Sequence, residues 1–170
     1  FDSSPMPFRG STKNAVEFVL LNKFGTPRAC CKSELLLQNN FDPSFSIGED
    51  QELWCRIAKT HPVFFHRQRT FIECDHPNRS IHFSNAEDNH NLLKQQIKTY
   101  PISRRTKLLL YSESYFSLTK NSIKKGKMKE AILYLLASIT LSPFHRQTKH
   151  KFLLLLSILK LYKPIYLAYK

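Results

Sequence analysis

The amino-acid sequence predicts an α/β segment over residues 1–90, followed by a mostly α-helical extension over residues 91–170. Three observations support this division. The first segment alternates short apolar runs with turns rich in Pro, Gly and Asn, as strands and short helices do. The second segment has long runs with apolar residues at helical spacing. The charge changes as well, because the first segment holds ten Lys/Arg and eleven Asp/Glu, whereas the second holds sixteen Lys/Arg and two Asp/Glu.

The turn residues of the first segment divide it into short elements. Residues 15–21 are an apolar run that fits either a strand or a turn of helix. Ser33 is expected to cap a short helix, and Gly48 precedes a clear amphipathic helix. Residues 63–66 and 69–74 are two candidate strands that could pair as a hairpin.

The second segment is expected to contain four helices, over residues 89–100, 103–124, 129–141 and 145–162. The last of them combines lysines with dense Leu, Ile and Tyr. Residues 145–170 therefore fit a segment that lies in a membrane interface, and they also fit a helix packed in a bundle. No apolar run approaches the roughly 20 residues that a membrane-spanning helix needs.

The composition narrows the class of function. Apolar residues make up 42% and charged residues 23%, which excludes general disorder. The net charge of +13 arises in the second segment, and such a basic surface attracts nucleic acid or an anionic membrane. With four glycines, a glycine-rich phosphate loop is not expected. Four cysteines without a C-x-x-C spacing, and no recognisable signal peptide, favour a cytoplasmic location.

The candidate chemistry centres on the adjacent carboxylates Glu49 and Asp50. Both fall in the first turn of the helix that follows Gly48, where the helix dipole and free backbone N–H groups favour an ionised carboxylate. An ionised carboxylate at a rim can accept a proton from an attacking hydroxyl. An acidic first turn also stabilises an ordinary helix, so the pattern alone leaves both interpretations open.

Residues 41–56 (FDPSFSIGEDQELWCR) and their flanks resemble the C-terminal part of the catalytic domain in family 2 glycosyltransferases, which have the GT-A fold. The resemblance covers about residues 15–85 and includes the Leu-Trp-x-Arg segment at 53–56 and the loop at 76–80. It implies an inverting transfer of a sugar from a nucleotide-sugar donor to a glycan or lipid-linked acceptor. Cell-surface polysaccharide and lipopolysaccharide synthesis are the implied settings.

The resemblance implies a role for each matching residue. Asp50 is the expected general base, and Glu49 is expected to bind the acceptor or orient that base. Trp54 and Arg56 are expected near the substrate, although a packing role for Trp54 and an ion pair for Arg56 fit as well.

The resemblance also implies a diphosphate and a divalent metal, Mg or Mn, in the complete enzyme. Arg79 suits the diphosphate because its guanidinium is a fixed fork of donors. His76 is a candidate metal ligand, and an ordinary loop histidine fits equally. Family members also hold metal and nucleotide through a D-x-D motif, which is absent from these 170 residues. The chain is therefore expected to be the C-terminal portion of a longer enzyme and inactive by itself.

The alternative function is a non-enzymatic basic module that binds nucleic acid or an anionic membrane. Tyr100, Tyr111, Tyr115 and Phe116 could stack on single-stranded bases. The lysines alternate with apolar helical positions, however, and no nucleic-acid-binding motif is present, so nucleic acid is the less favoured partner. Peripheral contact with the inner face of the plasma membrane, through residues 145–170, is compatible with either hypothesis.

Overall fold

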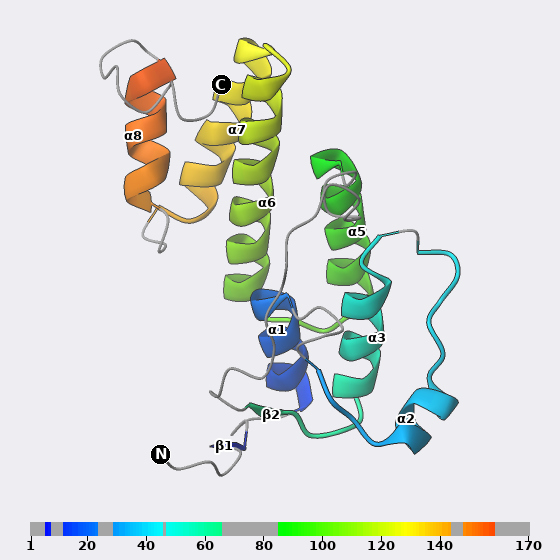
Figure 1. Cartoon of the computed structure of the whole chain (residues 1–170). Helices are drawn as coiled ribbons and strands as arrows, with labels where there is room; N and C mark the ends of the chain where they lie inside the picture. The colour runs from blue at the N-terminus through cyan, green and yellow to red at the C-terminus, as the bar shows by residue number, and fades with distance from the viewer. Residues whose placement is uncertain are drawn as a thin grey trace, which may run out of the picture. The chain divides into compact units, whose positions relative to one another are not determined.

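The computed structural model describes residues 6–7, 12–23, 29–45, 47–65, 85–143 and 148–158. The chain forms two compact units. The first comprises Phe1–Ser84 and Gln96–Ser103, and the second comprises Asn85–Gln95 and Arg104–Lys170. Figure 1 gives the order of the elements along the chain.

The first unit is built on two helices, α1 (Thr12–Asn22) and α3 (Glu49–Ala58), which pack against each other. A short helix, α2 (Ser33–Gln38), lies between them in sequence. Both main helices bury one apolar face: Ala15, Val16, Val19 and Leu20 on α1, and Leu53, Trp54, Cys55, Ile57 and Ala58 on α3. The Gln51 side-chain amide also donates to the backbone oxygen of Leu20 at 3.3 Å. Apolar burial and one polar contact therefore hold α3 to α1.

Residues 96–103 complete the first unit. They include the end of α5 (Ala86–Thr99), and they bury Ile97, Tyr100 and Ile102. The backbone N–H of Ser103 donates to Glu17 Oε1 at 2.5 Å, and the Ser103 hydroxyl donates to Glu17 Oε2 at 3.2 Å. These contacts fix the segment after α5 to α1.

The α/β prediction, with its GT-A sheet, is wrong. Helices account for 73% of the described residues. The strands among them are two residues long, β1 (Met6–Pro7) and β2 (Phe64–Phe65), and they pair antiparallel. The expected hairpin partner of β2, residues 69–74, lies outside the described residues.

The physical reason lies in which residues are buried. Residues 15–21 fitted either a strand or a helix, and the structure buries positions 15, 16, 19 and 20, which share one side of a helix and not one face of a strand. At β2, Phe64 is 59% exposed, so its apolar run does not mark the interior of a sheet. Helix packing therefore buries the apolar residues of α1, whereas Phe64 of β2 stays exposed.

The second unit is a helical hairpin with two further helical segments. Helices α6 (Arg104–Lys124) and α7 (Met128–Leu141) pack along each other, and α8 (Thr148–Ile158) packs against α7 (Figure 1). The shared core consists of Phe116, Ile123, Ala131, Leu135 and Leu154. The helices expected over 103–124 and 129–141 are confirmed to within one residue at each end. Within the described residues, no helix has the length and apolar character that crossing a membrane requires.

The turn between α6 and α7 depends on Gly126, whose φ is +74°. Its N–H donates to the oxygen of Ile123 at 3.0 Å, and the N–H of Lys127 donates to the oxygen of Ser122 at 2.8 Å. These two bonds form a Schellman motif, which satisfies carbonyls at the end of α6. A glycine adopts the left-handed conformation without the steric cost that a side chain brings.

The two sides of α7 differ in burial, and a pair of substitutions tests this. Leu135 is 0% exposed and Leu133 is 67% exposed. We expect Leu135→Ala to lower the free energy of unfolding by about 2–5 kcal/mol, because it leaves a cavity in the core. Leu133→Ala should change it by less than about 0.5 kcal/mol. Urea denaturation of both variants measures the difference, and equal effects would contradict the packing described above.

Candidate functional site

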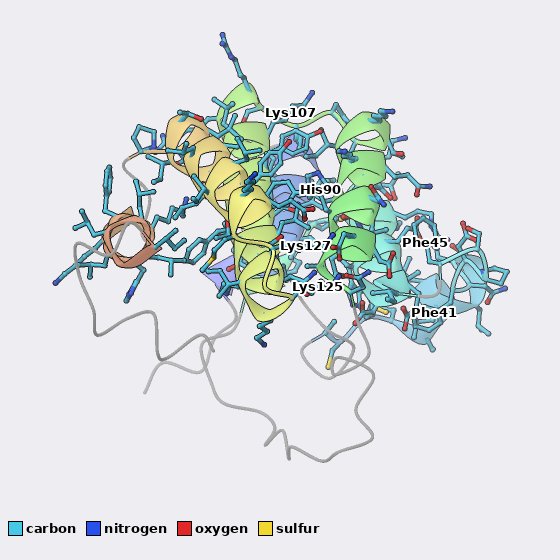
Figure 2. All side chains as sticks on the ribbon, turned by 90° about the horizontal axis from the view of Figure 1, so that it is seen from above. Phe41, Phe45, His90, Lys107, Lys125 and Lys127 are labelled. Carbon is cyan, nitrogen blue, oxygen red and sulfur yellow. The ribbon has the colours of Figure 1, made fainter. Side chains whose placement is uncertain are left out.

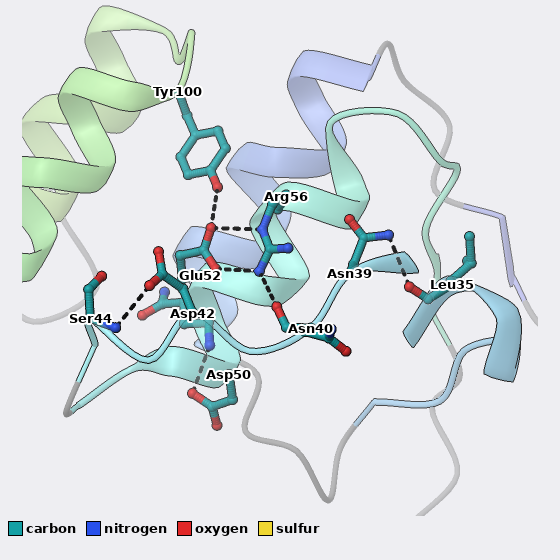
Figure 3. Close-up of polar contacts among 10 residues, drawn as sticks. Leu35, Asn39, Asn40, Asp42, Ser44, Asp50, Glu52, Arg56 and Tyr100 are labelled. Carbon is teal, nitrogen blue, oxygen red and sulfur yellow. Dashed lines mark hydrogen bonds and ion pairs between the residues drawn. The ribbon is translucent and has the colours of Figure 1, made fainter. Parts of the chain in front are cut away.

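The N-terminal turn of α3 brings the two predicted carboxylates to the surface. Gly48 is the N-cap residue, with φ at +73°, and its oxygen accepts the first helical hydrogen bond from Glu52 N at 3.0 Å. Glu49 is exposed and Asp50 is half-buried. Asp50 Oδ1 accepts a hydrogen bond from the backbone N–H of Gln51 at 2.7 Å (Figure 3). The turn therefore presents two carboxylates at the N-terminus of α3.

The opposite side of α3 anchors this turn in the core. Leu53, Cys55 and Ala58 are completely buried, and Trp54 is 9% exposed. The Trp54 indole nitrogen has no hydrogen-bond partner among the described residues. Its burial gives Trp54 a packing position, so stacking on an acceptor sugar would require neighbouring residues to move.

Arg56 takes part in a polar network on α3 (Figure 3). Its Nε donates to Glu52 Oε1 at 3.1 Å, and its Nη2 donates to Glu52 Oε2 at 2.8 Å. The same Nη2 donates to the backbone oxygen of Asn40 at 2.9 Å. The bidentate pair with Glu52 raises the pKa of Arg56, so the guanidinium stays charged. Arg56 thereby fixes the loop before α3 to the helix.

Tyr100 extends this network from a distant part of the chain. Its hydroxyl donates to Glu52 Oε1 at 3.4 Å, and burial, followed by the charge of Glu52, raises the pKa of Tyr100. The hydroxyl therefore remains a protonated donor at neutral pH. The sequence analysis did not single out Glu52, and it considered Tyr100 only for stacking on bases. The i,i+4 spacing of Glu52 and Arg56 could have revealed their pair, but nothing local connects either residue to Tyr100.

A second turn orders the loop that leads to the site. Asp42 Oδ1 accepts a hydrogen bond from Ser44 N at 2.9 Å. The Ser44 side chain, followed by this backbone bond, lowers the pKa of Asp42. The Asn39 amide donates to the oxygen of Leu35 at 2.9 Å, at the end of α2. Local side-chain bonds of this kind specify turns. The loop over residues 39–44 is therefore held at both of its ends.

The remaining predicted site residues, His76 and Arg79, lie outside the described residues. Across the described ranges, no three His, Cys, Asp or Glu side chains come together as a metal site. The carboxylates of α3 thus do not by themselves fit a divalent cation, which needs several oxygen ligands. The metal implied by the resemblance stays a prediction, and no chemical step is derived through it.

Two polar clusters in the second unit were not anticipated from the sequence. In the first, the ammonium of the fully buried Lys151 donates to Ser112 Oγ at 2.5 Å. The two serines Ser112 and Ser138 exchange hydrogen bonds of 2.6 Å, each hydroxyl donating to the other residue's backbone oxygen. These contacts connect α6, α7 and α8 in the core.

In the second cluster, His90 of α5 contacts α6. His90 Nδ1 lies 2.8 Å from Ser114 Oγ, and its ring lies 5.0 Å from that of Tyr115 (Figure 2 labels His90). Burial, with a smaller contribution from Lys94, lowers the pKa of His90. A neutral histidine that is buried between aromatic rings is typical of packing. Within the described residues, no further catalytic group joins His90 and Ser114.

Comparison with known proteins gives no relative on which to base an assignment. No family model matches the chain, and no match was found among curated proteins or solved structures. The function therefore has to be argued from the residues and their geometry.

The thiol of Cys55 is expected to resist modification. Burial, followed by the charge of Glu52, raises the pKa of Cys55, whereas Cys30 is exposed. Because the thiolate is the reactive form, iodoacetamide at about pH 8 should alkylate Cys30 at least about tenfold faster than Cys55. Peptide mass spectrometry of the native protein measures both rates. In denaturant the two rates should converge, and equal rates in the native protein would contradict the burial of α3.

The buried Lys151 should make the stability of the second unit depend on pH. Burial lowers the pKa of Lys151, while Glu113 opposes this shift, so the folded state binds its proton less tightly than the unfolded state does. The resulting penalty is present at neutral pH and fades as pH rises toward the ordinary lysine pKa. We expect the free energy of unfolding, relative to that of Lys151→Met, to rise between about pH 7 and pH 10. Urea denaturation at each pH measures it, and a constant difference would contradict the burial of a charged amine.

Proposed function

We propose that the first turn of α3 supplies the catalytic base of an inverting, nucleotide-sugar-dependent glycosyltransferase. Asp50 would take the proton of an acceptor hydroxyl while that oxygen forms a bond to the anomeric carbon of the donor sugar. The bond between this carbon and the nucleotide diphosphate breaks, and the diphosphate leaves with the electron pair. The acceptor class is a glycan or a lipid-linked sugar, as the resemblance of residues 41–56 implies.

One observation carries this proposal: Asp50 is half-exposed on a turn whose helix is anchored in the core by Leu53 and Cys55. A general base has to be ionised, reachable by the acceptor, and held in a fixed position. Partial exposure favours access by the acceptor, and core packing favours a fixed position.

The neighbouring residues divide the remaining roles. Glu49 is exposed beside Asp50, so we assign it to the acceptor. Arg56 already makes bonds to Glu52 and to Asn40, and we therefore assign it a positioning role for the loop before α3. Donor nucleotide and metal would be bound by residues other than those described, with Arg79 and His76 as the candidates from the sequence.

Asp50→Asn tests the proposed base. The amide keeps the size of the side chain but cannot accept the proton, so we expect kcat to fall by about 10²–10⁴ with a much smaller change in KM. The assay uses the complete enzyme with candidate acceptors. It follows the release of nucleoside diphosphate from a panel of nucleotide sugars.

Glu34→Gln is the matched control, because Glu34 is an exposed carboxylate in the first turn of α2 with no proposed role. Its kcat should equal that of the wild type. Transfer by Asp50→Asn at the wild-type rate would exclude Asp50 as the base. An equal loss in both variants would indicate a general effect of charge.

A further inference from the structure

Helix α7 has an apolar surface on the side opposite its core. Its buried positions are Ala131, Leu135 and Ser138, whereas Leu133 is 67% exposed and Leu136 is 43% exposed. Lys129 precedes these two leucines by four and seven residues, so all three share one side of the helix. A helix side that faced only water would be expected to carry polar residues there.

Helix α8 repeats the same arrangement. It buries Lys151 and Leu154 on one side. On another side it exposes Phe152, at 46%, and Leu156, at 39%, with the exposed Lys149 three residues before Phe152. Each of the two helices thus carries an exposed apolar pair preceded by a lysine. We call Lys129, Leu133 and Leu136 the apolar–basic surface of α7, and Lys149, Phe152 and Leu156 the apolar–basic surface of α8.

The turn between α6 and α7 adds positive charge next to Lys129. The lysines of this turn and of the adjoining helix ends are all exposed: Lys124, Lys125, Lys127 and Lys129 (Figure 2 labels Lys125 and Lys127). Lys125 pairs with Glu87 at 3.1 Å and Lys127 pairs with Glu130 at 3.2 Å, whereas no ion pair engages Lys124 or Lys129 within the described residues. Residues 91–170 hold sixteen Lys/Arg against two Asp/Glu, so acidic side chains cannot neutralise this charge.

The combination of charge and apolar side chains distinguishes between the candidate partners. A second copy of the chain would bring like charges together, which disfavours association through these surfaces. Single-stranded nucleic acid is bound by aromatic stacking, but three of the four exposed apolar side chains are leucines. A membrane interface uses both features, because aliphatic side chains enter the acyl boundary while lysines contact anionic headgroups.

We propose that the apolar–basic surfaces of α7 and α8 bind an anionic lipid bilayer. Leu133, Leu136, Phe152 and Leu156 would insert at the level of the headgroups, and the lysines of the α6–α7 turn would contact lipid phosphates. These surfaces do not depend on the proposed transferase activity. They also differ from the sequence-based expectation for residues 145–170, because α7 and its preceding turn supply part of them.

Vesicle sedimentation tests the apolar contribution. The full chain is mixed with vesicles of phosphatidylcholine alone, or with vesicles that also contain phosphatidylserine, at low salt. We expect the wild type to bind the anionic vesicles, and Leu133→Gln combined with Leu136→Gln to weaken that binding on the order of tenfold to a hundredfold. Leu37→Gln is the matched control, since Leu37 is 78% exposed on α2 in the first unit, and it should bind as the wild type does.

A second variant tests the charge separately. Lys124→Gln combined with Lys129→Gln should weaken binding to anionic vesicles and reduce its dependence on salt, with no effect on phosphatidylcholine vesicles. Circular dichroism melting should match the wild type for every variant, because all the changed side chains are exposed. If the double leucine variant melts early, Phe152→Gln combined with Leu156→Gln takes its place.

Three outcomes would overturn the lipid-binding surface. The first is failure of the wild type to bind anionic vesicles at low salt. The second is that the leucine variants bind anionic vesicles as strongly as the wild type does and bind single-stranded DNA equally tightly. That result would indicate a general polyanion site. The third is lipid-free self-association in sedimentation velocity that the leucine variants abolish, which would identify the surface as a contact between copies.

Discussion

The apolar face of α3 has to be removed from water, and α1 packs against this face. Five residues of α3 are buried, and three of them, Leu53, Cys55 and Ala58, are fully buried. This packing sets the direction of α3 and hence the position of its first turn. The α3 carboxylates, the Arg56 network and the contact with Tyr100 all depend on it, because each begins from a residue of this helix.

The polar contacts around α3 are consistent with this dependence. Glu52 accepts hydrogen bonds from both Arg56 and Tyr100. These bonds compensate the negative charge of Glu52 where α3 meets the rest of the first unit. Leaving a partly buried carboxylate without partners would cost free energy. The network therefore restrains the loop before α3 and leaves Glu49 and Asp50, one turn earlier, directed to the surface. A rigid helix with an accessible carboxylate at its start is what a general base requires.

The helices of the second unit carry more apolar side chains than their shared core contains. The shared core takes Phe116, Leu135 and Leu154, while leucines remain exposed on the other side of α7. Its buried Lys151 donates to Ser112 Oγ and to the backbone oxygen of Ser138. The excess of lysine on the turn next to these exposed leucines makes an anionic lipid surface a chemically complementary partner. An enzyme that elongates a lipid-linked acceptor would gain from such contact, which connects the two proposals without making either depend on the other.

The sequence by itself determined the helices whose ends and faces are encoded locally. Gly48 and the acidic residues after it predicted the start of α3, and periodic apolar residues predicted α6 and α7, because capping and helical spacing are local properties. The ion pair of Arg56 with Glu52 was also within reach, since the two residues are one turn apart. Only the tertiary structure decided that residues 15–21 are helical, because a short apolar run fits a strand equally well until its buried side is known. It also decided that Tyr100 and Ser103 return to the first unit and that Lys151 is buried between serines, because these contacts join residues that are far apart along the chain and leave no local pattern.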